Sequence, residues 1–113
     1  MMDITPEDAK LVTLARASRA RTGARHGAAV RDQDGRTYAA STVELPSVKI
    51  DALDLAVAMA VSSGATGIEA AALVADRHPE PIVRGTAVRD LSGGGVNVFI
   101  ADPAGDVVRV GTT

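Results

Sequence analysis

The segment VKIDALDLAVAMAVSS, residues 48–63, is a long apolar stretch that organises the rest of the chain. Its only acidic residues are Asp51 and Asp54. A run of this length exceeds an ordinary strand and predicts a helix, with Ser47 as its N-cap and Gly64 at its end. Because a helix this apolar has to be covered on most sides, we expect it at the centre of the domain.

Length and composition limit the kinds of protein that this chain can be. A chain of 113 residues predicts one domain, residues 1–113, that is large enough to bury a core. Hydrophobic residues make up 46% but aromatic residues only 2%, so few side chains are suited to stacking on bases. The net charge of −2 argues against a dedicated nucleic-acid binder. The absence of cysteine excludes disulfides, thiolate zinc sites and cysteine nucleophiles.

The N-terminal residues MMDITPEDAK lack the basic and apolar regions of a signal peptide. No apolar run reaches the length needed to span a membrane. We therefore expect a cytoplasmic protein with no membrane partner.

Residues 5–8, TPED, predict the start of a helix. Thr5 suits the N-cap position, Pro6 suits the first helical position, and Glu7 and Asp8 complement the helix dipole. Apolar residues then recur at helical spacing, which predicts a helix over residues 6–21.

The other segments predict strands, a short helix and turns. The sequence DQDG at residues 32–35 is typical of a hairpin turn, and the mostly apolar run at 68–75 is typical of a strand covered on both faces. The expected elements besides the two helices above are strands at 27–30, 36–43, 68–75, 96–101 and 106–110, a loop at 77–81 and a short helix at 83–91. This order predicts an α/β fold, with helices packed on one sheet.

A basic cluster lies at the end of the first predicted helix. It consists of Arg16, Arg19, Arg21 and Arg25, with no acidic residue among them. Such a cluster can contact phosphates, which leaves an RNA- or ribosome-associated protein as one hypothesis. The alternative is a solvated helix end, where cations also complement the dipole. The lack of aromatic partners favours this alternative.

The element order, with GAAVRDQDGRTYAASTVEL at residues 27–45 followed by an apolar helix, resembles the cytidine deaminase family. That family has a V-G-A-A strand, a D-G turn, an N-x-E-N segment, a helix opening with C-A-E or H-A-E, and a P-C-x-x-C loop before the next helix. The resemblance extends over residues 6–110. It implies a three-layer α/β/α sandwich around a five-stranded mixed sheet, and a homo-oligomer, either a dimer or a tetramer.

The chain departs from the family pattern at the positions that carry the chemistry. The sequence TVEL at residues 42–45 stands in place of N-x-E-N and keeps only Glu44, at the position that contacts the ribose. Asp51 takes the place of the first zinc ligand, and Leu53 that of the proton-shuttling glutamate. The P-C-x-x-C loop falls near residues 81–84, which contain no cysteine.

These departures predict a protein without the family's zinc site. Zinc-dependent deamination needs three strong metal ligands and a carboxylate that moves protons. Our first hypothesis is therefore a non-catalytic binding or assembly module that needs no cofactor. A site formed by His26, Asp51 and His78 has no recognised ligand spacing and is disfavoured.

Two acidic residues remain as candidate ligand-binding residues. Glu44 follows a strand beside the predicted apolar helix, where α/β sheets tend to bind ligands, and is the stronger candidate for a nucleoside-like molecule. Asp51 stands in the first turn of that helix, where it also complements the dipole. The second hypothesis is an altered nucleoside-acting hydrolase that uses Glu44 and Asp51. The alternative to ligand binding by Glu44 is a structural role, in which its carboxylate accepts hydrogen bonds from N–H groups at the start of the helix.

Overall fold

The computed structural model describes residues 4–76 and 85–113. Its main sheet has the strand order β2-β1-β5-β6-β7. β5 (Ile68–Ala75) lies in the middle, antiparallel to β1 (His26–Asp32) and parallel to β6 (Asn97–Ala101). β2 (Thr37–Ser41) and β7 (Val107–Thr112) form the two edges, each antiparallel to its neighbour. The predicted five-stranded mixed sheet is therefore confirmed.

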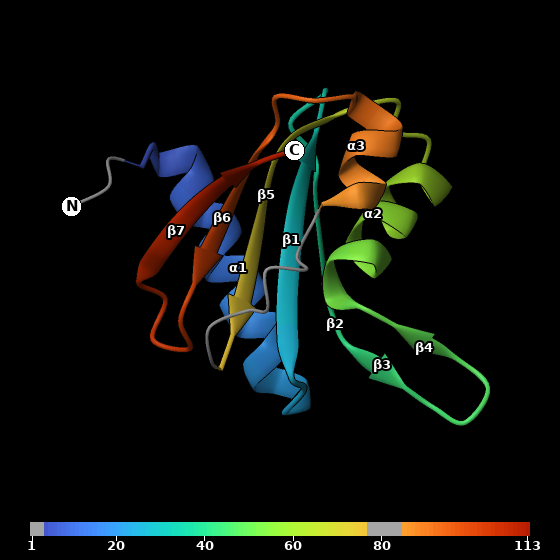
Figure 1. Cartoon of the computed structure of the whole chain (residues 1–113), viewed down its shortest axis with the longest axis vertical. Helices are drawn as coiled ribbons and strands as arrows, with labels where there is room; N and C mark the ends of the chain where they lie inside the picture. Colours follow the sequence, from blue (N-terminus) through green and yellow to red (C-terminus); the bar gives the residue numbers. More distant parts are fainter. Residues whose placement is uncertain (1–3, 77–84) are drawn as a thin grey trace.

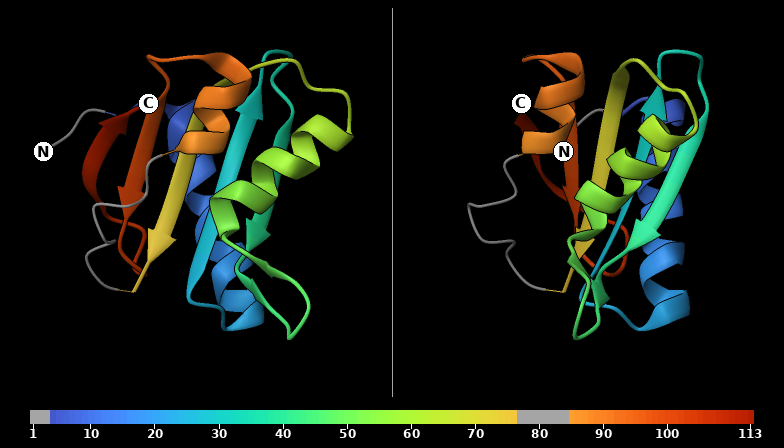
Figure 2. Two further views of the ribbon diagram at one scale, coloured as in Figure 1. Left: turned by 45° about the vertical axis from the view of Figure 1, so that its right-hand side comes forward. Right: turned by 90° about the vertical axis from the view of Figure 1, so that its right-hand side faces the viewer.

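Helices cover both faces of this sheet. α1 (Pro6–Thr22) packs on one face, while α2 (Ala52–Ser62) and α3 (Thr86–Ser92) lie on the other (Figures 1 and 2). A separate hairpin of β3 (Val43–Glu44) and β4 (Lys49–Ile50) projects from the start of α2 (Figure 1). The three layers confirm the α/β/α sandwich that the resemblance implies.

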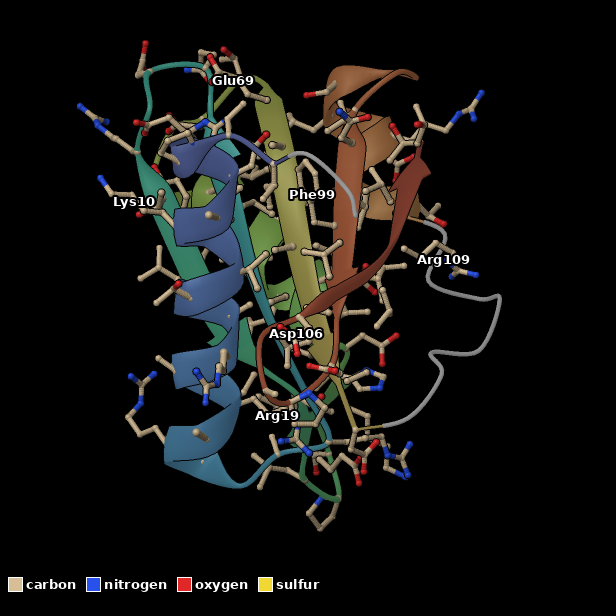
Figure 3. All side chains as sticks on the ribbon, turned by 90° about the vertical axis from the view of Figure 1, so that its left-hand side faces the viewer. Lys10, Arg19, Glu69, Phe99, Asp106 and Arg109 are labelled. Carbon is tan, nitrogen blue, oxygen red and sulfur yellow. The ribbon has the colours of Figure 1, made fainter. Side chains whose placement is uncertain are left out.

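The core consists of two apolar layers, one on each face of the sheet. Leu11, Ala15 and Phe99 belong to the layer under α1, where Phe99 is the chain's one phenylalanine (Figure 3). Leu53 and Leu73 belong to the layer under α2 and α3. Because small side chains line much of both layers, the helices approach the strands closely.

The closest approach occurs between α1 and β1 at Gly27. A Cβ atom on Gly27 would lie 2.1 Å from the carbonyl oxygen of Ala15 and 2.7 Å from Cβ of Arg19. No side chain fits there. Gly23, in the left-handed region at φ 65°, ends α1 and donates its N–H to the carbonyl of Arg19.

The start of α1 has the predicted cap. The Thr5 hydroxyl accepts a hydrogen bond from the N–H of Asp8 (3.1 Å), and Pro6 occupies the first helical position. Asp8 also ties the helix to the sheet, because its carboxylate accepts a hydrogen bond from Nη2 of Arg31 (3.0 Å). The same guanidinium reaches Glu69 of β5 through Nε (3.1 Å).

The predicted hairpin turn at residues 32–35 is confirmed and is held by a buried carboxylate. Asp32 accepts hydrogen bonds from the N–H groups of Asp34 and Arg36 and from the Tyr38 hydroxyl. Burial alone would raise the pKa of Asp32, but these hydrogen bonds outweigh it and hold the pKa below its usual value. The turn is thus fixed by a side chain as well as by its glycine.

The predicted helix at residues 48–63 is wrong at its start. Residues 43–50 form the β3–β4 hairpin instead, closed by the hydrogen bond from the N–H of Leu45 to the carbonyl of Val48 (2.8 Å). β-branched side chains and Pro46 favour extended and turn backbone there. Ser47 lies in the turn and is not the cap, because Asp51 occupies the N-cap position.

The expectation that this helix lies at the centre, covered on most sides, is also wrong. α2 buries one face, formed by Ala52, Leu53, Ala56, Val57 and Ala60. Its other face is exposed: Met59 is 38% and Val61 49% accessible. β5, covered on both sides, is the central element. Apolarity alone did not reveal that one face of α2 is left open in a single chain.

The remaining boundaries agree within a few residues. α3 begins at Thr86, and residues 83–84 of the helix predicted at 83–91 lie outside the described residues. The predicted loop at 77–81 lies outside the described residues. No helix in the ranges 4–76 and 85–113 has the length and apolarity needed to span a bilayer.

Candidate functional site

A surface hollow of about 500 Å³ lies at one end of the sheet. Asp76 directly follows β5, and Thr42 and Glu44 follow β2, so the hollow meets the carboxyl ends of these strands. Ligands of open α/β sheets bind at this end. The lining residues come from three stretches of the chain, 19–25, 42–44 and residue 76: Arg19, Thr22, Gly23, Ala24, Arg25, Thr42, Glu44 and Asp76.

Two arginines form the basic part of the lining. Arg19 stands in the last turn of α1 (Figure 3), and its Nε donates a hydrogen bond to the carbonyl of Arg25 (3.2 Å). The left-handed turn at Gly23 brings Arg25 back toward the helix end. Within the described part of the chain, neither guanidinium forms a salt bridge.

Two carboxylates and two hydroxyls form the rest of the polar lining. Glu44 is exposed at the base of the β3–β4 hairpin, and Asp76 is exposed after the last residue of β5. The Thr22 hydroxyl lies 2.9 Å from the Ser41 hydroxyl, and Oγ1 of Thr42 accepts a hydrogen bond from the N–H of His26 (3.1 Å). The formal charges of the lining therefore balance.

Asp51 lies outside this hollow. It is exposed at the N-cap position of α2, and its side chain makes no capping hydrogen bond. It is close enough to His26 to affect its pKa. Partial burial lowers the pKa of His26, and the charge of Arg25 lowers it further. The carboxylates of Asp51 and Asp76 act in the opposite direction. Only one of the two predicted acidic residues, Glu44, therefore lines the hollow. A hydrolase using Glu44 and Asp51 together gains no support from this placement.

The start of α2 is acidic. Partial burial raises the pKa of Asp54, and the carboxylates of Asp51 and Asp90 add to the shift. In the part of the chain that the structure describes, no three His, Cys, Asp or Glu side chains converge as metal ligands. His78, the third member of the disfavoured metal site, lies outside the described residues.

The position that the resemblance assigns to the catalytic glutamate is filled by core packing. The helix opens with Asp51, Ala52 and Leu53, and the Leu53 side chain is only 5% accessible within the layer under α2 and α3. Among the described residues, the donor at the first-ligand position is the Asp51 carboxylate, and the sequence has no cysteine that could supply a thiolate. These residues do not fit the family's zinc ion.

The four N-terminal arginines do not form one patch. Arg16 donates from Nε to the carbonyl of Pro103 (3.0 Å) and borders a second hollow, near the β6–β7 turn. Arg21 is exposed and lines neither of these hollows. The structure thus brings Arg19 and Arg25 together and places Arg16 and Arg21 elsewhere. Nucleic-acid contact by these residues stays a prediction.

Sequence reasoning missed Asp76 and the two threonines of the hollow. Asp76 had a usable signal, because it is the first charged residue after an apolar strand and so lies at the strand's carboxyl end. Thr42 also had one, because it stands at the first position of the segment that replaces N-x-E-N. Thr22 had none, since only the folded chain brings a helix end next to a strand end.

Comparison with known proteins agrees with this architecture. Solved cytidine deaminases superpose well on the chain: that of Burkholderia pseudomallei has a TM-score of 0.75 at 23% identity, covering 97% of this chain and 92% of its own. That of Mycobacterium leprae has a TM-score of 0.70 at 20% identity, covering 97% of this chain and 94% of its own. That of Mycobacterium tuberculosis has a TM-score of 0.66 at 24% identity, covering 79% of this chain and 80% of its own.

At these identities the likeness establishes the fold. A search of curated protein sequences gives no significant match. The model of the cytidine deaminase-like family matches residues 4–105. The chain therefore belongs to the cytidine deaminase-like family.

Proposed function

We propose that this chain is a non-catalytic member of its family that acts as a binding or assembly module. The observation that carries the proposal is Leu53. It occupies the helix position where the resemblance places the proton-shuttling glutamate, and it is 5% accessible in the core. The start of the helix supports this alignment, since Asp51 is its N-cap and Ala52 its first residue.

The chemistry of the family explains why this replacement supports the proposal. A zinc deaminase needs a metal-bound hydroxide to attack the ring and a carboxylate to carry protons. Losing a general acid/base alone lowers rates by roughly 10²- to 10⁴-fold. Here an aliphatic side chain stands at that position, and the first zinc-ligand position holds a carboxylate without thiolate partners.

What the chain keeps is a polar hollow at the carboxyl end of the sheet. Glu44 lines it, and a carboxylate accepts hydrogen bonds from ligand hydroxyls. The hollow is within the size range of small-molecule sites. We assign it the binding of a small hydroxylated molecule.

The direct test of the proposal is deamination by purified, zinc-supplemented protein. We expect no conversion of cytidine or deoxycytidine above a no-protein blank, in an assay where an active cytidine deaminase serves as positive control. Turnover that disappears on substitution of Asp51 or Leu53 would contradict the proposal. Turnover unaffected by both substitutions would point to a contaminating enzyme.

Assembly is the second part of the proposal. The open face of α2 carries Met59 and Val61, both exposed in the single chain, and such a face is suited to packing against a second copy. We expect the molar mass from light scattering to correspond to a dimer or tetramer, and Val61→Glu to shift it toward the monomer. Thr37→Glu, on the exposed edge strand β2, is the matched control. A wild-type monomer at high concentration would contradict this part.

A further inference from the structure

We infer that the hollow binds a small hydroxylated phosphate monoester, with the phosphate on Arg19 and Arg25 and the hydroxyls on Glu44 and Asp76. The inference rests on the binding role proposed for the hollow and adds the chemical class of its ligand. Arginines and carboxylates from separate parts of the chain meet in this one concave site.

The two arginines are arranged to hold an anionic group. Arg19 uses Nε on the carbonyl of Arg25, and its two terminal nitrogens form no hydrogen bond to residues 4–76 or 85–113, so their N–H groups can meet a ligand. That hydrogen bond also fixes the half-buried Arg19 side chain against the loop that carries Arg25. Two guanidinium groups beside one hollow match the oxygens of a phosphate, because each presents a planar fork of donors.

The two carboxylates exclude a bare anion as the preferred ligand. Glu44 and Asp76 repel a free phosphate dianion, and they offer only hydrogen-bond acceptors. A ligand that satisfies them has to carry donors, such as hydroxyl groups, at a distance from its phosphate. A polyanion such as RNA gains little here, since the charges of the lining cancel and the chain carries −2 overall.

The ligand class follows from both halves of the site together. A sugar phosphate or a nucleoside monophosphate carries a phosphate at one end and hydroxyls at the other. The hollow of about 500 Å³ is within the range of sites that take molecules of this size. The shared chemistry is a phosphate monoester on a hydroxylated carbon chain or ring.

The test is calorimetric titration of the full chain with five probes at fixed ionic strength. Ribose 5-phosphate and cytidine 5′-monophosphate carry the phosphate; ribose, cytidine and inorganic phosphate are their incomplete counterparts. We expect each phosphorylated probe to bind at least about tenfold more tightly than its unphosphorylated counterpart and than inorganic phosphate, since charge-assisted hydrogen bonds are involved. Equal affinity of the two phosphorylated probes identifies the sugar phosphate as the recognised part, and tighter binding of cytidine 5′-monophosphate adds the base.

Variants locate the binding. Arg25→Gln changes an exposed loop residue and is expected to weaken both phosphorylated probes by about tenfold or more. Glu44→Gln is expected to weaken all ribose-containing probes. The matched control is Arg21→Gln, which removes the same charge from the last turn of α1 but outside the hollow. It is expected to leave every affinity unchanged.

Three outcomes would overturn the inference. If Arg21→Gln weakens binding as much as Arg25→Gln, the effect is general charge and not a site. If cytidine binds as tightly as its monophosphate and Glu44→Gln weakens both, the binding role stands but the phosphate assignment falls. If none of the five probes binds, the ligand class is wrong. The deamination assay judges the non-catalytic role separately in each case.

Discussion

Leu53→Glu is expected to destabilise the protein by about 4 kcal/mol or more, because it places a carboxylate in the core and removes the packing of a buried leucine. The substitution restores the residue type that the family uses for catalysis, yet among the described residues Leu53 is packed in an apolar core cluster. We therefore expect lower stability in urea denaturation and no gain of deaminase activity.

The control for this variant is Ala17→Glu, on the exposed face of α1 and away from the face of α2 that the assembly proposal uses. It is expected to change the free energy of unfolding by about 0.5 kcal/mol or less. If Leu53→Glu were as stable as Ala17→Glu, the position would open into a polar site, and the claim that the catalytic position has become core would be wrong.

Gly27→Ala is expected to have the second large effect, a loss of about 3 kcal/mol in the free energy of unfolding. The new Cβ would lie 2.1 Å from the carbonyl oxygen of Ala15, so α1 has to move away from β1. This shift would also displace Arg19, whose Cβ lies 2.7 Å from the same point. Denaturant unfolding monitored by circular dichroism measures the loss.

Gly67→Ala is the control for this substitution. The nearest atoms to a Cβ at Gly67 are the Ser92 hydroxyl oxygen at 3.5 Å and Cβ of Gln33 at 4.0 Å, which are ordinary contacts. Its expected effect is therefore within about 1 kcal/mol, since Gly→Ala in compatible backbone is mild or stabilising. Equal losses in the two variants would show that α1 does not pack on β1 as closely as described.

The sequence predicted most of the fold because local signals and the global arrangement agree. Thr5 and Pro6 marked the start of α1, the apolar run at 68–75 marked the central strand with its boundaries unchanged, and Asp32 with its following residues marked the hairpin. In each case a hydrogen-bonding requirement or a periodicity of side chains fixes the element within a few residues.

The predictions for residues 48–50 and for the burial of α2 failed because the local sequence pattern and the global arrangement disagree there. Residues 48–50 continue the pattern of the following helix. In the fold, however, their backbone pairs with residues 43–45 in the β3–β4 hairpin. Apolar residues occur on both faces of α2, although only one face is buried. The sequence pattern therefore does not distinguish the covered face from the exposed one. Hydrophobic periodicity describes what can be buried and not what a single chain buries.

The candidate site was predicted only in part. Glu44 was identified through the resemblance, and it does line the hollow. Asp51 was predicted together with Glu44, but the β3–β4 hairpin lies between them in the chain. Glu44 belongs to β3, whereas Asp51 is the N-cap of α2 and lies outside the hollow. Arg19 and Arg25 meet because of the left-handed turn at Gly23, which the spacing of the four arginines in the sequence does not reveal.

The chain keeps the fold of its family, and we propose that it lacks the family's zinc site. The most direct measurement is the zinc content of untagged protein, purified in zinc-supplemented medium and dialysed, by elemental analysis. We expect no zinc above the dialysis buffer. About one zinc per chain, lost in both Asp51→Ala and His26→Ala variants that remain folded, would contradict the account.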